Sequence, residues 1–296
     1  MIGDPPNILI GSMVDSVSFN DFIVHVAPII PLIMLVTFFP IWAIWGRKLS
    51  ASPEAQARVL AFSEKDAITD HDLMKKSLSV LGMVLAGFVI GHPFGIEPAT
   101  IAMTGAALLL FIDNLGKKVE EKSENVHHTF GESEWVTIFF FVGLFIIVFG
   151  LEEAGALKIV SDSIIDMTAG AESPQAVAEL LGPAILWVSA IFSAIVDNIP
   201  FVATMIPTLE QVFANLAEQG LPLTEELEGA MWWCLSLGAC LGGNGSLIGA
   251  SANLIVAGMA ERGGHRIGFL QFMKHAFPLM IGSVLIAWAY LEIRYL

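Results

Sequence analysis

Apolar residues in this chain form long blocks and do not follow the spacing of amphipathic helices. Spanning a hydrocarbon core takes about 20 mostly apolar residues in a helix. A backbone that faces lipid must satisfy its own hydrogen bonds, which favours helices. The pattern therefore predicts an all-α integral membrane protein. Its full or nearly full spans are Val24–Trp45, Leu78–Ile96, Thr100–Ile112, Trp135–Leu151, Leu180–Leu209, Ala230–Ala260 and Ala276–Leu291.

Composition and charge narrow the class of protein further. Hydrophobic residues make up 55% of the 296 positions, charged residues make up 15%, and the formal net charge is −15. Because nucleic-acid binding requires positive charge, no nucleic-acid partner is expected, and the apolar blocks make a lipid bilayer the expected surroundings. The negative charge alone names no other partner. Cys234 and Cys240 lie six residues apart in one apolar block, on different helix faces. This spacing predicts core residues and no disulfide framework.

Basic residues between the blocks indicate how the chain is oriented. Loops on the cytoplasmic side of a membrane carry an excess of Lys and Arg. The loops after the first and third blocks are basic, whereas residues 91–98 carry no Lys or Arg and residues 152–175 carry only Lys158. The first and third loops are therefore predicted inside and the other two outside.

The block Leu180–Leu209 is interpreted as a re-entrant hairpin. If it crossed the membrane once, the loop 210–228, which has no Lys or Arg, would be cytoplasmic, and the basic segment 262–274 would face outward. A hairpin that enters from the outside and returns leaves both segments on the sides that the charge rule requires. The sequence Asp197-Asn198-Ile199-Pro200 interrupts the apolar run and marks the turn.

Two motifs at the start of the chain recur near its end in the same order. IGDPPNILIG (Ile2–Gly11) matches IGASANLIVA (Ile248–Ala257), and FxxFxxHxxP follows each copy, at Phe19–Pro28 and at Phe269–Pro278. By the predicted orientation, the two copies face opposite ways across the membrane. Inverted repeats with interrupted helices are typical of secondary transporters, which bind their ions where the breaks meet.

The segment Gly238–Asn253, GACLGGNGSLIGASAN, predicts such a break. Its glycines permit backbone conformations that other residues avoid, and its Asn and Ser side chains offer polar groups. A half-helix that begins near Leu247 would point its positive end at the break. Gly242 and Gly243 taken alone fit close helix packing equally well.

These residues resemble a known family. SAIVDNIPFVATMIPTL (Ser193–Leu209), GGNGSLIGASANLIVAG (Gly242–Gly258) and IGDPPNILIG together resemble the ion transporter superfamily, in particular the branch of NhaD-type sodium/proton antiporters, ArsB arsenite permeases and the melanosomal P protein. The resemblance implies a homodimer in which a unit of hairpins and broken helices slides against a scaffold, an elevator-type mechanism. It also implies a glycine-rich break and an inner hairpin before IGDPPN, which this sequence lacks, so we expect an N-terminally truncated chain.

The predicted organisation follows from the repeat and the resemblance. Residues 1–46 would be the remnant of the first repeat, residues 47–76 a cytoplasmic loop and residues 77–296 the complete second repeat. Within the second repeat we expect scaffold spans at 77–151, the re-entrant hairpin at 176–209, the broken helix at 228–261 and the last span at 276–292.

The candidate ion site gathers at the hairpin tip and the breaks. A carboxylate such as Asp197 within an apolar block is costly in lipid and favours a functional role, although Asp is also a favoured helix N-cap. Desolvation favours its protonated form and a bound cation favours its charged form, so H⁺ and Na⁺ would compete for it. Hard cations prefer oxygen ligands, here predicted from Asp197, Asn198, Asn244 and Asn253. The full candidate set is Asp4, Asn7, Asp197, Asn198, Pro200, Gly242, Gly243, Asn244, Ser246, Ser251 and Asn253.

The sequence therefore predicts a Na⁺/H⁺ antiporter of the inner or plasma membrane, with no cofactor, because Na⁺ and H⁺ are its cargo. An arsenite or oxyanion permease, a sodium-coupled dicarboxylate carrier and a non-transporting membrane fragment remain open. An intramembrane protease is not expected. Neither tyrosine is followed by Asp, and the pattern that precedes a rhomboid-type serine is missing before Ser246.

Overall fold

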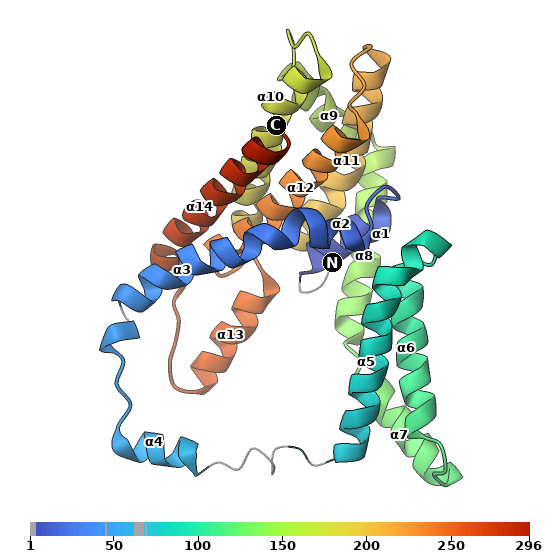
Figure 1. Ribbon diagram of the computed structural model, residues 1–296, viewed down its shortest axis with the longest axis vertical. Helices are drawn as coiled ribbons and strands as arrows, with labels where there is room; N and C mark the ends of the chain where they lie inside the picture. Colours follow the sequence, from blue (N-terminus) through green and yellow to red (C-terminus); the bar gives the residue numbers. More distant parts are fainter. Residues whose placement is uncertain (1–3, 45, 62–67, 69) are drawn as a thin grey trace. The chain divides into compact units, whose positions relative to one another are not determined.

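The computed structural model describes residues 4–44, 46–61, 68 and 70–296, and within them it contains helices and connecting turns but no strands (Figure 1). This confirms the predicted all-α fold. In that part of the chain four segments are long and apolar enough to cross a membrane: Phe19–Lys48, His71–Gly91, Pro174–Ile195 and Phe269–Arg294. Residues 1–3, with the glycine of the GDPPN motif, and residues 62–67, with Lys65 of the predicted loop, lie outside the described residues.

The chain forms two compact units, Met1–Phe39 with Phe139–Leu296 and, separately, Pro40–Ile138. The smaller unit contains α4 (Pro53–Leu60), α5 (His71–Gly91), α6 (Pro98–Asp113) and α7 (Val119–Gly131). Helices α5 and α6 pack as an antiparallel pair, in which Gly105 of α6 lies directly against Val84 of α5.

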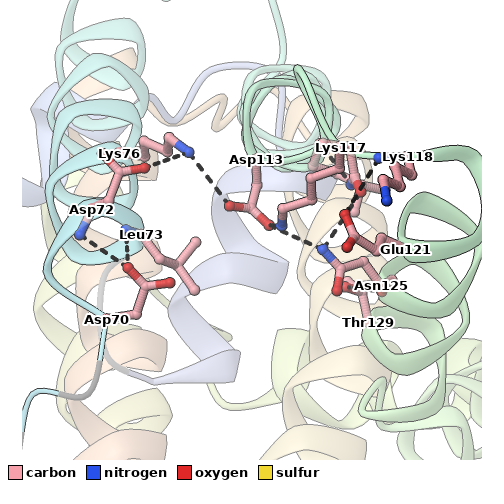
Figure 2. Close-up of polar contacts among 12 residues, drawn as sticks. Asp70, Asp72, Leu73, Lys76, Asp113, Lys117, Lys118, Glu121, Asn125 and Thr129 are labelled. Atoms are coloured by element: carbon pink, nitrogen blue, oxygen red, sulfur yellow. Dashed lines mark hydrogen bonds and ion pairs between the residues drawn. The ribbon is translucent and has the colours of Figure 1, made fainter.

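Polar side chains join the ends of α5, α6 and α7 (Figure 2). The Asp113 carboxylate pairs with Lys117 Nζ at 2.7 Å and with Lys76 Nζ at 3.6 Å. The Asp70 carboxylate accepts hydrogen bonds from the backbone N–H groups of Asp72 at 2.9 Å and Leu73 at 2.8 Å, as an N-cap does. This cap explains why α5 begins at His71, six residues before the predicted boundary of the loop 47–76, which also contains α4.

The larger unit is built around a helical hairpin and a broken helix. The hairpin consists of α10 (Pro174–Ile195) and α11 (Asn198–Glu218), and the broken helix consists of α12 (Glu225–Gly242) and α13 (Ser251–Arg262), with the short helix η6 (Gly243–Gly245) at the break. Helix α12 runs parallel to α10. Gly238 lies against Leu186, and Gly242, one turn further, lies against Ala190. The hairpin tip and the break therefore lie at the same level of the unit.

The helices extend further than hydropathy predicts. Helix α11 continues to Glu218, nine residues beyond the predicted end of the hairpin, and α12 begins at Glu225, where the Thr224 hydroxyl caps it. The last helix, α14, runs from Phe269 to Arg294, longer than the predicted span 276–292. Hydropathy locates the apolar middle of a helix, whereas capping side chains set its ends.

The two copies of the repeat form corresponding elements. The IG motif forms α1 (Pro5–Met13) in the first copy and α13 in the second. FxxFxxHxxP begins α14 in the second copy and, in the first, the segment of α2 (Phe19–Asp21), η1 (Phe22–Val26), η2 (Ala27–Ile29) and α3 (Ile30–Ile44). His25 at the start of this segment contacts Tyr295 at the end of the other copy, whereas Thr37 further along lies 3.5 Å from Ser283. The copies therefore run antiparallel, as an inverted repeat requires.

Helices α8 (Trp135–Glu153) and α9 (Ala156–Asp166) complete the fold and meet at a bend of 67°. Helix α9 packs on α11, where Asn215 Nδ2 donates to Ser161 Oγ at 3.4 Å.

Replacing Ser193 with alanine is expected to lower the free energy of unfolding by about 1 kcal/mol, because a buried hydrogen bond is lost. Ser193 Oγ of α10 donates to the Ala239 carbonyl oxygen of α12 at 2.6 Å. Thermal unfolding of the purified protein measures the effect. Ser163→Ala is the control, since that exposed hydroxyl donates only within its own helix. Equal stability of the two variants would contradict the prediction.

Candidate functional site

Three helices begin next to one another at the hairpin tip. They are α1, α11 and α13, and the residues at their N-cap positions are Asp4, Asp197 and Ala250. Each helix N-terminus carries a partial positive charge from its unpaired N–H groups. The Asp4 and Asp197 carboxylates therefore lie where this positive potential stabilises negative charge.

Asp197 joins the hairpin to the second half of the broken helix. One carboxylate oxygen accepts the backbone N–H of Ile199 at 3.0 Å, which caps α11, and the other accepts the Ser251 hydroxyl at 2.8 Å. Pro200 lies in the first turn of α11, where its missing N–H leaves no intrahelical bond unmade. Asp197 is thus an N-cap and also a partner of Ser251 in the break, and the capping role does not exclude ion binding.

Asp4 has weaker partners. The buried Asn198 directs its amide nitrogen at the carboxylate, 3.4 Å from each of the two oxygens, which is long for a hydrogen bond. The Asp4 side chain makes no cap hydrogen bond to α1. Of the two carboxylates at the tip, Asp4 therefore has longer hydrogen bonds to Asn198 than Asp197 has to its own partners.

Asn7 is held by two side chains that the sequence did not single out. Its amide oxygen accepts the Ser236 hydroxyl at 2.6 Å and the Cys240 thiol at 3.4 Å, both from α12. Cys234 is fully buried, as expected of a core residue, whereas Cys240 is partly exposed beside the site. Ser236 and Cys240 lie one helical turn apart in a uniformly apolar block, so only the spacing of four residues links them in the sequence.

The break in the broken helix is held together by its own polar groups. Asn253 Nδ2 donates to the carbonyl oxygens of Gly243 and Ser246, both at 3.0 Å, and the Ser246 hydroxyl accepts the Gly249 N–H at 3.1 Å. The exposed Asn244 donates to the Cys240 carbonyl at 3.2 Å. These amide nitrogens stabilise the break, while the amide oxygens of Asn244 and Asn253 take no part in the same bonds.

The two candidate glycines have different neighbours. A Cβ on Gly243 would lie 3.3 Å from the Asn198 amide nitrogen, so Gly243 borders the site. A Cβ on Gly242 would lie 2.5 Å from Ala190 Cα and closer still to the Ala190 carbonyl oxygen. Gly242 therefore occupies a close contact between α10 and α12, which is the packing alternative.

A cavity of about 450 Å³ adjoins the site. Asp4, Asn7, Cys240 and Asn244 form its polar wall, and apolar side chains of the segment Phe19–Ile30 form the opposite wall. The described residues that line this cavity include no Lys, Arg or His, and no ion pair at Asp4 or Asp197 is found in the described part of the chain. The arrangement offers oxygen ligands and negative charge to a small ion.

The apolar helical spans and the broken helix are those of a multi-pass membrane protein. A family model described as "Citrate transporter" matches residues 1–232, and the chain belongs to this family of the ion transporter superfamily. The resemblance found in the motifs is thereby confirmed.

Three relatives show what this chain is similar to. It is 35% identical to an uncharacterized transporter of Mycobacterium bovis and 32% identical to a 46 kDa membrane protein of Mycobacterium leprae, over its whole length in both cases. It is 33% identical to the human P protein over 81% of its own length and 27% of that protein. The chain spans 63% and 64% of the two mycobacterial relatives. No solved structure matches.

Proposed function

We propose that this chain belongs to a secondary transporter that exchanges Na⁺ for H⁺ across the inner or plasma membrane of the cell. The observation that carries the proposal is the pair of carboxylates, Asp4 and Asp197, at a hairpin tip that also provides amide, hydroxyl and carbonyl oxygens. A hard cation prefers such ligands, and a carboxylate binds either a cation or a proton.

The difference between the two carboxylates supports a division of labour. Asp197 is held by two good hydrogen bonds and keeps the tip against the break. Asp4 borders the cavity, where the Asn198 amide nitrogen lies 3.4 Å from each of its oxygens and the Cys240 thiol also contacts it. A small cation can replace those contacts at little cost, so Asp4 is proposed as the exchanging carboxylate and Asp197 as a ligand that also positions the tip.

The moving part is proposed to be the hairpin together with the broken helix, in an elevator-type mechanism within a homodimer. The close packing of α10 on α12 at Gly238 and Gly242 supports movement of these elements as one body. The resemblance to the superfamily supplies the idea of a sliding unit and a partner scaffold.

A citrate or dicarboxylate carrier is the second candidate, because the family description names citrate and helix N-termini attract anions. The chemistry of the cavity opposes it, since Asp4 would repel a carboxylate substrate and the lining supplies no basic side chain among the described residues. An arsenite permease needs only hydrogen-bond partners and is the third candidate.

Proteoliposomes loaded with a pH-sensitive dye test the proposal. Adding NaCl outside is expected to raise the internal pH, whereas choline chloride is not, because inward Na⁺ movement drives H⁺ outward. Citrate and arsenite uptake are measured in parallel. Uptake of citrate or arsenite without a Na⁺-dependent pH change would contradict the proposal and favour a carrier of that substrate. No transport of Na⁺, citrate or arsenite would favour a non-transporting membrane fragment.

A further inference from the structure

An apolar groove runs between the two antiparallel copies of the repeat, away from the candidate ion site. It has a volume of about 550 Å³. Ile29 and Leu32 from the first copy and Ile286, Ala289 and Ile293 from α14 form its sides. Leu32 is 49% exposed and Ile293 is 87% exposed. In a helix that crosses a membrane, apolar side chains with such exposure face lipid chains.

One end of the groove carries a positive charge that aromatic rings hold in place. Arg294, the last residue of α14, lines the groove, and its guanidinium lies 5.6 Å from the centre of the Tyr290 ring and 5.3 Å from that of Tyr295. Arg294 Nη1 also donates to the Tyr290 hydroxyl, which in turn donates to the His25 carbonyl oxygen at 2.7 Å. These contacts fix the guanidinium beside the apolar groove.

The charge of Arg294 is not neutralised by a carboxylate within ion-pair distance in the part of the chain that the structure describes. Its position at the end of a candidate membrane span places it at the level of lipid headgroups. The chain as a whole has a net charge of −15, so general attraction cannot draw an anionic lipid to this surface. A local cation next to an apolar groove can attract such a lipid.

We propose that this groove binds one phospholipid, with an acyl chain between the two repeat copies and the phosphate on Arg294. Guanidinium groups bind phosphate through paired hydrogen bonds. The apolar side chains of the lining accept the acyl chain, and the polar groups that line the groove, those of Tyr290 and Arg294, lie at its phosphate end. The bound lipid would fill the space between the ends of the two copies, and this proposal does not depend on which ion is transported.

Native mass spectrometry of the delipidated 296-residue protein tests the proposal. The probes are phosphatidylglycerol, glycerol phosphate, which has no acyl chain, and diacylglycerol, which has no phosphate. The variants are Arg294→Gln, which removes the cation, and Ala289→Trp, which fills the groove. Lys274→Gln, near the other end of the same helix, is the matched control, and a melting curve of each variant establishes that it is folded.

We expect the wild type and Lys274→Gln to bind one phosphatidylglycerol per chain. Arg294→Gln is expected to weaken binding about fivefold, the effect of losing about 1 kcal/mol from one basic residue at a lipid surface. Ala289→Trp is expected to weaken binding at least as much. Equal binding by wild type and both variants would overturn the proposal. Binding of glycerol phosphate alone would replace it with a free-anion site, and equal binding of diacylglycerol would replace it with a non-selective apolar surface.

Discussion

Replacing Asp197 with asparagine is expected to shift Na⁺-dependent proton movement to much higher Na⁺ concentrations while leaving the protein folded. An asparagine oxygen can still accept the Ile199 N–H, and its NH₂ group can donate to the Ser251 hydroxyl, so both contacts of Asp197 survive in a neutral form. The charge that attracts a cation is lost. At an effective dielectric constant of about 20, this attraction is worth a few kcal/mol at contact distance, which corresponds to a loss of about a hundredfold in apparent Na⁺ affinity.

The measurement is the initial rate of pH change in proteoliposomes over a range of NaCl concentrations. Asp166→Asn is the matched control, because it removes a carboxylate from an exposed position at the end of α9. The control is expected to retain the wild-type rate. If Asp197→Asn also retained it, Asp197 would be an N-cap without a role in ion binding.

Replacing Gly242 with alanine is expected to destabilise the protein by about 3 kcal/mol. The added methyl group would lie 2.5 Å from Ala190 Cα, a distance at which two helix backbones must separate. Helix packing of this kind cannot adjust by rotating a side chain, so the cost falls at the upper end of the range for overpacked cores. The same movement would lengthen the hydrogen bond from the Ser193 hydroxyl to the Ala239 carbonyl oxygen.

A thermal melt of the purified protein measures this effect, and Gly229→Ala is the control in the same helix. The nearest atom to a Cβ at Gly229 is Trp233 Nε1 at 3.7 Å, an ordinary contact. Alanine there is expected to be neutral or to stabilise the helix by about 0.5–1 kcal/mol, since glycine is the poorer helix former. Similar melting temperatures for the two variants would show that α10 and α12 do not pack through Gly242.

Local sequence patterns contain enough information to locate the main elements of the site. Asp197-Asn198-Ile199-Pro200 interrupts an apolar block, and the structure has its helical hairpin turn there. The glycines after Cys240 mark the broken helix for the same reason, since a run of glycine and small polar residues cannot continue a membrane helix. The repeated motifs form corresponding helices because the same residues have the same local preferences in both copies.

Helix ends were harder to predict. Asp70 begins α5 and Thr224 begins α12 through hydrogen bonds of single side chains, which a hydropathy average does not detect. Charged residues near the ends of α11 and α12 also lower the hydropathy although both helices continue through them.

The sequence by itself determined the class of this protein, its helical spans, its inverted repeat and the candidate residues, because each depends on neighbouring residues. Tertiary structure alone decided which candidates meet. Asp4 and Asn198 are far apart in the chain but their side chains lie 3.4 Å apart in space, and Cys240 joins the site through contacts with Asn7 and Asp4. Gly242 contacts a helix backbone and Gly243 borders the site, although they are adjacent in sequence. Such contacts follow from how helices pack, and packing depends on surfaces that no local pattern specifies.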